Sequence, residues 1–273
     1  MVANHLFTYT LFLADNTLIL GQRNSEWCGH GPVLEQDIAI TNISLDLLGQ
    51  ARNFYQYAAT LYNSFSSEEK DAVDSLIPRI WKSFDRELAE DDLAFLRDDH
   101  QYRNLLLTEL PVGDWAQTIL RQFFFSAFQF YLYEGLKESN DAQLAAIAEK
   151  SSKEVVYHLR WSSEWVIRLG DGTEESNARI NKALVFLWPF TGELFMATIF
   201  EEAVLTNGFG VSADTIRNSW IKKVEEIFRE ATLKVPESTW AQSGGKEGRH
   251  TEHFGFLLAE MQHLQRAYPN SVW

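Results

Sequence analysis

The chain has 273 residues, of which 45% are hydrophobic, enough apolar material for one large folded core or two small ones. Acidic residues outnumber basic ones by 38 to 24, and the net charge of -14 opposes binding to nucleic-acid backbones. We find no secretory signal and no apolar run long enough for a transmembrane helix, and the single cysteine, Cys28, cannot form an internal disulfide. These features predict a soluble, cytoplasmic protein without nucleic-acid or membrane partners.

Helical periodicity runs through nearly the whole chain, and nothing marks a linker, so we expect one domain over residues 1–273. A short helix over 7–22 is followed by a long one over 33–62, which carries two apolar stripes and should be packed on two sides. Further helices are expected over 68–88, 114–137, 141–169, 176–205, 212–231 and 251–268. No alternating strand pair is found, so the predicted class is all-α.

The helix over 114–137 is apolar on every side, which indicates a central position. Together with the helices over 33–62, 141–169 and 176–205 it forms the predicted four-helix core, and the remaining helices are additions to that bundle.

The helix over 33–62 also carries polar residues among its apolar ones. Glu35, Asn42 and Asp46 are spaced so that they lie roughly above one another on the helix. A carboxylate without water or a partner costs several kcal/mol, so we expect a buried Asp46 within reach of a basic or amide side chain, or of a metal.

Inward-facing acids on long helices suggest a test against the di-iron carboxylate bundle, in which two helices give one Glu each and two give a Glu-x-x-His pair. That spacing puts both side chains on one helix face, where they can bind two irons. The literal pattern occurs at Glu247/His250, in a Gly-rich loop, and at Glu260/His263, off the apolar stripe of its helix. Both are interpreted as chance matches.

The interior helices offer an incomplete ligand set. Ser126 and Gln129 have the correct spacing but neither ligand type, and Glu193 is followed at the His position by Met196. The residues that remain as candidates for a vestigial metal site are Asp46, Glu154, His158 and Glu193. Three acids and one histidine fall short of the four carboxylates and two imidazoles of a di-iron pair, so no metal, cofactor or catalytic residue is predicted in this chain.

Each candidate also has a structural interpretation. Glu154 and His158 are expected to form a hydrogen-bonded pair beside Trp161 and Trp165. Asp46 fits a buried polar cluster, and Glu193 fits a solvated acid near a bend at Pro189. His250 and His253 are expected to act in capping and packing where the last helix begins.

Several segments resemble one known family in the same order along the chain. They are Glu26-Trp-Cys-Gly-His30, Ser44-Leu-Asp-Leu-Leu-Gly-Gln-Ala-Arg-Asn-Phe54, Arg103-Asn-Leu-Leu-Leu107, Lys153-Glu-Val-Val-Tyr-His-Leu-Arg160, Gly244-Gly-Lys-Glu-Gly-Arg-His-Thr-Glu-His253 and Leu258-Ala-Glu-Met-Gln262. The chain is similar over almost its whole length to the PaaC subunits of the multicomponent ring epoxidase that acts on phenylacetyl-CoA. The polar segment over 68–88 departs from this pattern.

The resemblance implies a ferritin-like fold and a non-catalytic structural subunit of the epoxidase in aerobic phenylacetate degradation. In that assembly a sister subunit, PaaA, holds the di-iron site and the CoA thioester, and the complex is expected to be a heterotetramer. For the isolated chain, the alternative to this complex is a homodimer. The alternative functions are a di-iron oxygenase with a degenerate ligand set and a free-standing binding protein. The sequence does not identify the interface residues or any contact with CoA.

Overall fold

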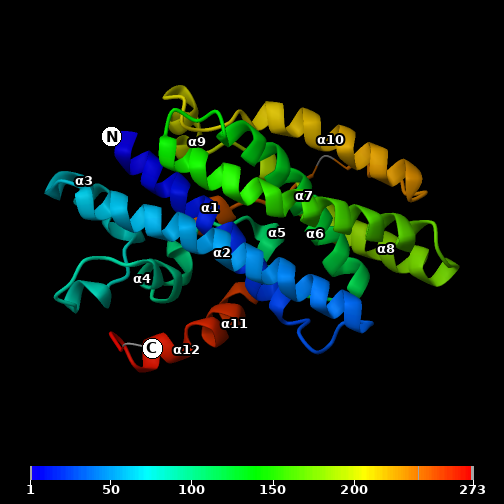
Figure 1. Ribbon diagram of the computed structural model, residues 1–273, viewed down its shortest axis with the longest axis horizontal. Helices are drawn as coiled ribbons and strands as arrows, with labels where there is room; N and C mark the ends of the chain where they lie inside the picture. Colours follow the sequence, from blue (N-terminus) through cyan, green and yellow to red (C-terminus); the bar gives the residue numbers. More distant parts are fainter. Residues whose placement is uncertain (1, 239, 272–273) are drawn as a thin grey trace. The chain divides into compact units, whose positions relative to one another are not determined.

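A computed structural model describes residues 2–238 and 240–271, and within these residues it contains helices and no strand. The first half of the chain contains α1 (Val2–Ser25), α2 (Leu34–Ser64), α3 (Ser67–Ala72), α4 (Glu90–Phe95), α5 (Leu106–Glu109) and α6 (Trp115–Leu136). The second half contains α7 (Ala142–Gly170), α8 (Glu174–Leu187), α9 (Ile199–Thr206), α10 (Ala213–Glu230), α11 (Glu252–Met261) and α12 (His263–Ala267). The predicted all-α, ferritin-like class is confirmed at the level of helix content and of long helical pairs (Figure 1).

The chain divides into two compact units. Unit 1 comprises the described residues of Met1–Leu110, Thr198–Val204 and Gly244–Trp273. Unit 2 comprises the described residues of Pro111–Ala197 and Leu205–Ser243. The expectation of a single domain over 1–273 stays a prediction.

Unit 1 is built on the packing of α1 against α2, with α3, α4, α5 and α11 added around this pair. The two long helices approach closely at Gly21, where a Cβ atom would lie 3.3 Å from the Leu47 Cβ and Leu48 Cγ atoms. The helix predicted over 7–22 is present, but its short length and its place outside the core are wrong. α1 has 24 residues, most of them buried, and it brings the polar residues Asp15 and Asn16 inside.

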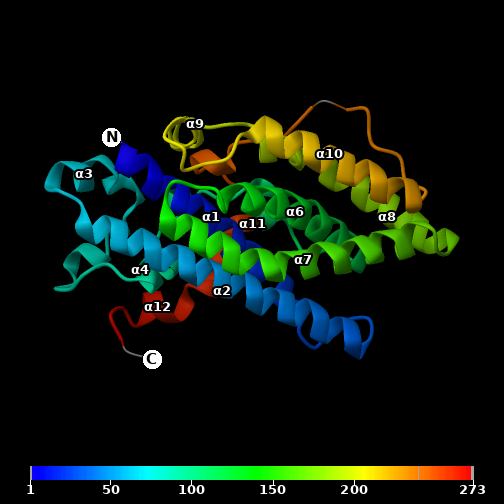
Figure 2. The same cartoon turned by 45° about the horizontal axis from the view of Figure 1, so that its top comes forward.

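Unit 2 is built on α6 and α7, with α8 and α10 packed against them (Figure 2). The central position predicted for the Phe-rich helix is confirmed, since Phe123, Phe124 and Phe125 on α6 are all buried. The indole Nε1 of Trp220 on α10 donates a hydrogen bond to the Phe124 carbonyl at 2.9 Å, which satisfies the polar end of a buried indole.

Two predicted helices are shorter in the structure than expected, and each is followed by a proline. The helix expected over 176–205 ends at Leu187, and Pro189 lies in the 3-10 turn Trp188–Phe190 that follows. The outer helix expected over 68–88 is likewise reduced to α3, and the chain beyond Ala72 continues in short 3-10 turns on both sides of Pro78. Proline lacks the N–H that would bond to the preceding turn and its ring clashes there, so α8 ends where the sequence predicts a bend at Pro189. At Pro78 the sequence predicts a split, and α3 already ends at Ala72. Within the described residues, no single helix is long and apolar enough to cross a membrane.

Candidate functional site

Asp46 lies on α2 in unit 1 and is half-buried, whereas the sequence predicts a buried carboxylate. Glu35 and Asn42, which are expected on the same side of the helix as Asp46, are exposed. The buried face of α2 consists of Ile40, Ile43, Ser44, Leu47, Gln50 and Ala51. At 3.6 residues per turn, Asp46 falls beside this face and not on it.

Glu154 and His158 both lie on α7 in unit 2, one helical turn apart. His158 is completely buried, whereas Glu154 is half-buried. The Glu154 carboxylate is close enough to affect Tyr133 on α6. Burial raises the pKa of the Tyr133 phenol well above its ordinary value, the hydrogen bond from Gln129 lowers it in part, and the negative charge of Glu154 raises it further. Tyr133 is therefore a neutral phenol at physiological pH.

Ser126 and Gln129 occupy interior positions of α6, as the sequence predicted, with exposures of 0% and 1%. The Gln122 Nε2 atom donates a hydrogen bond to Ser126 Oγ at 2.8 Å. The Gln129 Nε2 atom donates to the Tyr133 hydroxyl at 3.0 Å. The interior of α6 thus carries two hydrogen-bonded pairs of neutral amides and hydroxyls, whereas a binuclear centre would need negative charge.

Glu193 is buried, so its interpretation as a solvated acid is wrong. It lies in the 3-10 turn Gly192–Phe195, beyond the break at Pro189, and not on a long helix. Met196, expected to replace an interior ligand, follows this turn and is 43% exposed. A helical spacing argument therefore does not apply to Glu193 and Met196.

These residues do not fit a di-iron pair. Glu154, His158 and Glu193 supply only two carboxylates and one imidazole, and Asp46 is only half-buried on α2. Among the described residues, no group of three or more His, Cys, Asp or Glu side chains is placed to hold a metal ion. A hollow of about 710 Å³ beside α11 and α12 and one of about 360 Å³ beside α10 are lined by none of the four candidates.

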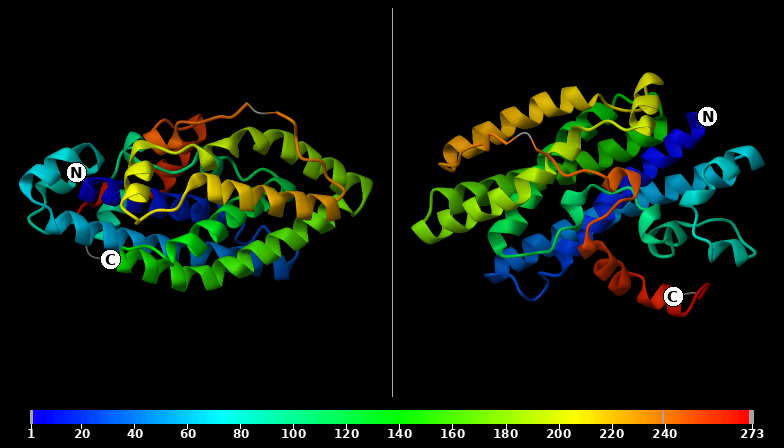
Figure 3. Two further views of the ribbon diagram at one scale, coloured as in Figure 1. Left: turned by 90° about the horizontal axis from the view of Figure 1, so that it is seen from above. Right: turned by 180° about the vertical axis from the view of Figure 1, so that it is seen from behind.

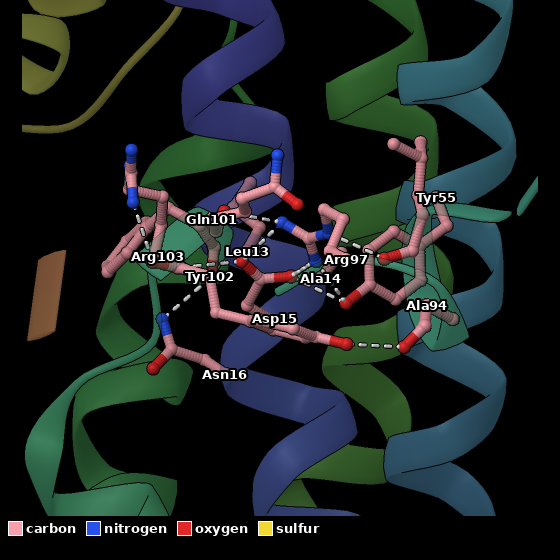
Figure 4. A network of polar contacts seen from close by, with 12 residues as sticks. Leu13, Ala14, Asp15, Asn16, Tyr55, Ala94, Arg97, Gln101, Tyr102 and Arg103 are labelled. Carbon is pink, nitrogen blue, oxygen red and sulfur yellow. Dashed lines mark hydrogen bonds and ion pairs between the residues drawn. The ribbon is translucent and has the colours of Figure 1, made fainter. Parts of the chain in front are cut away.

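A cluster of buried charged and polar residues is centred on Asp15 in unit 1 (Figure 4). The sequence analysis did not predict this cluster. Asp15, Tyr55 and Arg97 come from α1, α2 and the residues just after α4, and all have exposures of 0–1%. The Arg97 guanidinium forms an ion pair with the Asp15 carboxylate, and the Tyr55 hydroxyl donates a hydrogen bond to the same carboxylate at 2.5 Å.

Every polar atom of this ion pair has a partner. The five N–H groups of Arg97 donate to Asp15, Tyr55, Gln101 and Leu93, the last two through their carbonyls. The Asp15 carboxylate also accepts from the Arg103 backbone N–H at 2.7 Å. Burial lowers the pKa of Arg97, but the charge of Asp15 outweighs this effect and the net direction is upward. Because no donor or acceptor is left for a substrate, we assign the Asp15 cluster to structure and not to catalysis.

Glu109, at the end of α5, is also a buried carboxylate, and it contacts the start of the C-terminal segment. Its carboxylate accepts hydrogen bonds from the Asn104 Nδ2 atom at 2.8 Å and from the Thr251 backbone N–H at 2.6 Å, and it lies 2.7 Å from His250 Nδ1. The His250 ring stacks on Phe254, with ring centres 4.2 Å apart. Figure 3 shows α11 and α12, in red, at the carboxyl-terminal end of the chain. The packing role predicted for His250 is confirmed.

Comparisons with known proteins agree on one family. A family model described as phenylacetic acid catabolic protein matches residues 2–273. The chain belongs to this family. It is also 47% identical over 270 residues to one of the subunits of the 1,2-phenylacetyl-CoA epoxidase of Escherichia coli (strain K12), an alignment that covers 99% of this chain and 100% of that protein. Membership in the family named by the sequence resemblance is thereby confirmed, together with a part in phenylacetate catabolism.

Proposed function

We propose that this chain is a non-catalytic structural subunit of a cytoplasmic phenylacetyl-CoA epoxidase, and that it docks to and stabilises a PaaA-like di-iron subunit. The observation that carries the proposal is the pair of buried, neutral, hydrogen-bonded side chains on α6, Ser126 and Gln129. A serine and a glutamine cannot supply the charge and the imidazole that a di-iron pair requires. The name of the Escherichia coli relative, which describes it as one subunit of an epoxidase, supports assembly with other subunits.

The first test of this proposal is the iron content of the purified chain. After expression in iron-replete medium, elemental analysis is expected to find far less than one iron per chain, because Glu154, His158 and Glu193 fall short of a di-iron ligand set. The di-iron partner, purified in parallel, is the positive control. Two irons per chain would favour the alternative function, a di-iron oxygenase with a degenerate ligand set.

The second test is turnover by the reconstituted complex. Co-expression with the cognate PaaA-like subunit is expected to give a stable complex, and epoxidation of phenylacetyl-CoA is expected to disappear when this chain is omitted. Glu154→Ala and His158→Ala are expected to retain turnover in complexes that still form, because neither side chain takes part in chemistry. Full turnover by the partner alone, or its loss in an intact Glu154→Ala complex, would refute the assignment.

A further inference from the structure

The hollow of about 360 Å³ beside α10 lies within unit 2. It is formed by the two 3-10 turns that follow α8, the first half of α10, and the chain that turns back after α10 (Figure 2). Its lining contains the aromatic side chains Trp188, Phe195, Trp220 and Trp240, together with Met196. We call it the aromatic hollow.

Three of the rings are fixed by packing against one another. The ring centre of Trp220 lies 5.2 Å from that of Phe195 and 6.0 Å from that of Trp188. The Trp220 residue has 2% exposure, and its indole N–H is already bonded to the Phe124 carbonyl. Trp220 therefore offers carbon surface to a ligand, and the ring cluster does not have to be ordered when a ligand binds.

The chain after α10 is fastened to the turns after α8, so the hollow is preformed. The Gln242 backbone N–H donates a hydrogen bond to the Pro189 carbonyl at 2.8 Å. At Gly192 a Cβ atom would lie 2.4 Å from the Ala241 Cβ, and this close approach of the two segments requires glycine. Both contacts hold the segment that carries Trp240 next to the aromatic rings.

Two apolar side chains of the hollow are open to solvent. Trp240 is 62% exposed and Met196 is 43% exposed. Single exposed apolar residues are ordinary, but these two border the same hollow as three packed aromatic rings. A flat ring that entered the hollow would remove their surface from water, which favours binding.

The size of the hollow distinguishes between flat ligands. A cavity of about 150 Å³ is enough to hold benzene. The aromatic hollow, at about 360 Å³, has more than twice that volume and falls in the range of pockets that enclose larger ligands. It therefore suits a two-ring heterocycle with a substituent better than a single phenyl ring.

The hollow also contains one base and one acid. Arg217 on α10 and Glu237 on the chain after it both line the hollow, and both are exposed. A guanidinium binds phosphate oxygens through paired N–H groups, and a carboxylate accepts hydrogen bonds from N–H or O–H donors. A fitting ligand thus combines a flat two-ring system that carries an N–H donor with a phosphate. An adenine nucleotide has all three features.

We propose that the aromatic hollow binds adenine nucleotides, with the purine stacked on Trp240, the phosphate at Arg217 and the adenine amino group donating to Glu237. This chemistry occurs in free nucleotides such as AMP and also in the nucleotide half of coenzyme A. Only the coenzyme A source rests on the proposed epoxidase function. The net charge of -14 opposes anions at long range, so binding is expected to be weak and to depend on salt.

Isothermal titration calorimetry of the full-length chain with AMP provides the test. Saturable binding of AMP is expected. Trp240→Ala should weaken it by about tenfold, because the stacking surface for the purine is lost. Phe256→Ala is the matched control, since Phe256 is an apolar side chain on α11 with 75% exposure and does not line the hollow, and it should leave AMP binding unchanged.

A second pair of measurements tests the charged groups. Arg217→Gln should weaken AMP binding by about tenfold and leave the binding of adenosine, which has no phosphate, unchanged. Arg229→Gln is the control, because Arg229 is an exposed base on the same helix that does not line the hollow. IMP, which has a carbonyl in place of the adenine amino group, should bind less tightly than AMP, and Glu237→Gln should reduce this preference because an amide can donate to the carbonyl.

Coenzyme A as a second ligand identifies the source. Tighter binding of coenzyme A than of AMP would support coenzyme A, and equal binding would support free nucleotides. No binding of either at millimolar concentration, binding unaffected by Trp240→Ala and Arg217→Gln, or tighter binding of phenylacetate than of AMP would overturn the proposal. Thermal unfolding of each variant checks that the fold is retained. Failure here would leave the iron content and turnover predicted for the epoxidase function unchanged.

Discussion

Replacing Arg97 by methionine is expected to lower the free energy of unfolding by about 3–5 kcal/mol, among the largest effects of any single substitution in this chain. Methionine has a similar length but no N–H group. The change would leave the Asp15 carboxylate in a site with 0% exposure without its ion-pair partner, and the Leu93 and Gln101 carbonyls without their donors. Urea unfolding followed by circular dichroism would measure the loss as a shift of the midpoint.

The matched control for this prediction is Arg168→Met. Arg168 lies over the Trp165 ring with 5.5 Å between the guanidinium carbon and the ring centre, but its side chain is 61% exposed. Its removal should cost less than about 1 kcal/mol. The double variant Asp15→Leu with Arg97→Met should be more stable than Arg97→Met alone, because no charge is then buried without a partner. Equal stability of Arg97→Met and Arg168→Met would show that the Asp15 cluster contributes little.

The helices of this fold can be predicted from the sequence because the spacing of apolar residues reflects which side of each helix is buried. The all-round apolar character of α6 correctly predicts an interior helix, and the stripe of α7 correctly predicts a helix buried along one face. The same spacing predicts a bend at Pro189 where the structure has a break, since a periodic pattern continues past a proline even when the hydrogen-bond ladder does not. α1 is underestimated because the polar residues Asp15, Asn16 and Thr17 interrupt its stripe.

A buried acid needs a partner, and this rule holds in the present fold. Helical spacing predicts that the buried acid is Asp46, whereas the structure buries Asp15. The partners of Asp15 lie 40 residues away at Tyr55 and 82 residues away at Arg97. Local spacing cannot report a pairing across such separations. By contrast, Ser126 and Gln129 are correctly placed inside the fold because their three-residue spacing lies within a single helix turn.

Replacing Glu109 by glutamine is expected to lower the free energy of unfolding by about 3 kcal/mol and to loosen the C-terminal segment specifically. Glutamine keeps the shape of the side chain but turns one oxygen into an N–H₂ group. The amide can take two orientations at the Glu109 site, which has 0% exposure. In one orientation the N–H₂ group faces the Asn104 Nδ2 donor, and in the other it faces the Thr251 N–H donor. Hydrogen exchange should show faster exchange of α11 amides in this variant, whereas the amides of α1 and α2 should keep most of their protection.

Glu247→Gln is the matched control for that variant, because Glu247 is an exposed acid three residues before His250 and its ion pair with Arg249 lies at the surface. Loss of an exposed pair should change the free energy of unfolding by less than about 1 kcal/mol and leave α11 protected. If Glu109→Gln lowered protection uniformly over α1, α2 and α11, the C-terminal segment would unfold only with the rest of unit 1. A local effect would instead show that the attachment at Glu109 holds α11 as a separate cooperative element, since His250 and Thr251 immediately precede that helix.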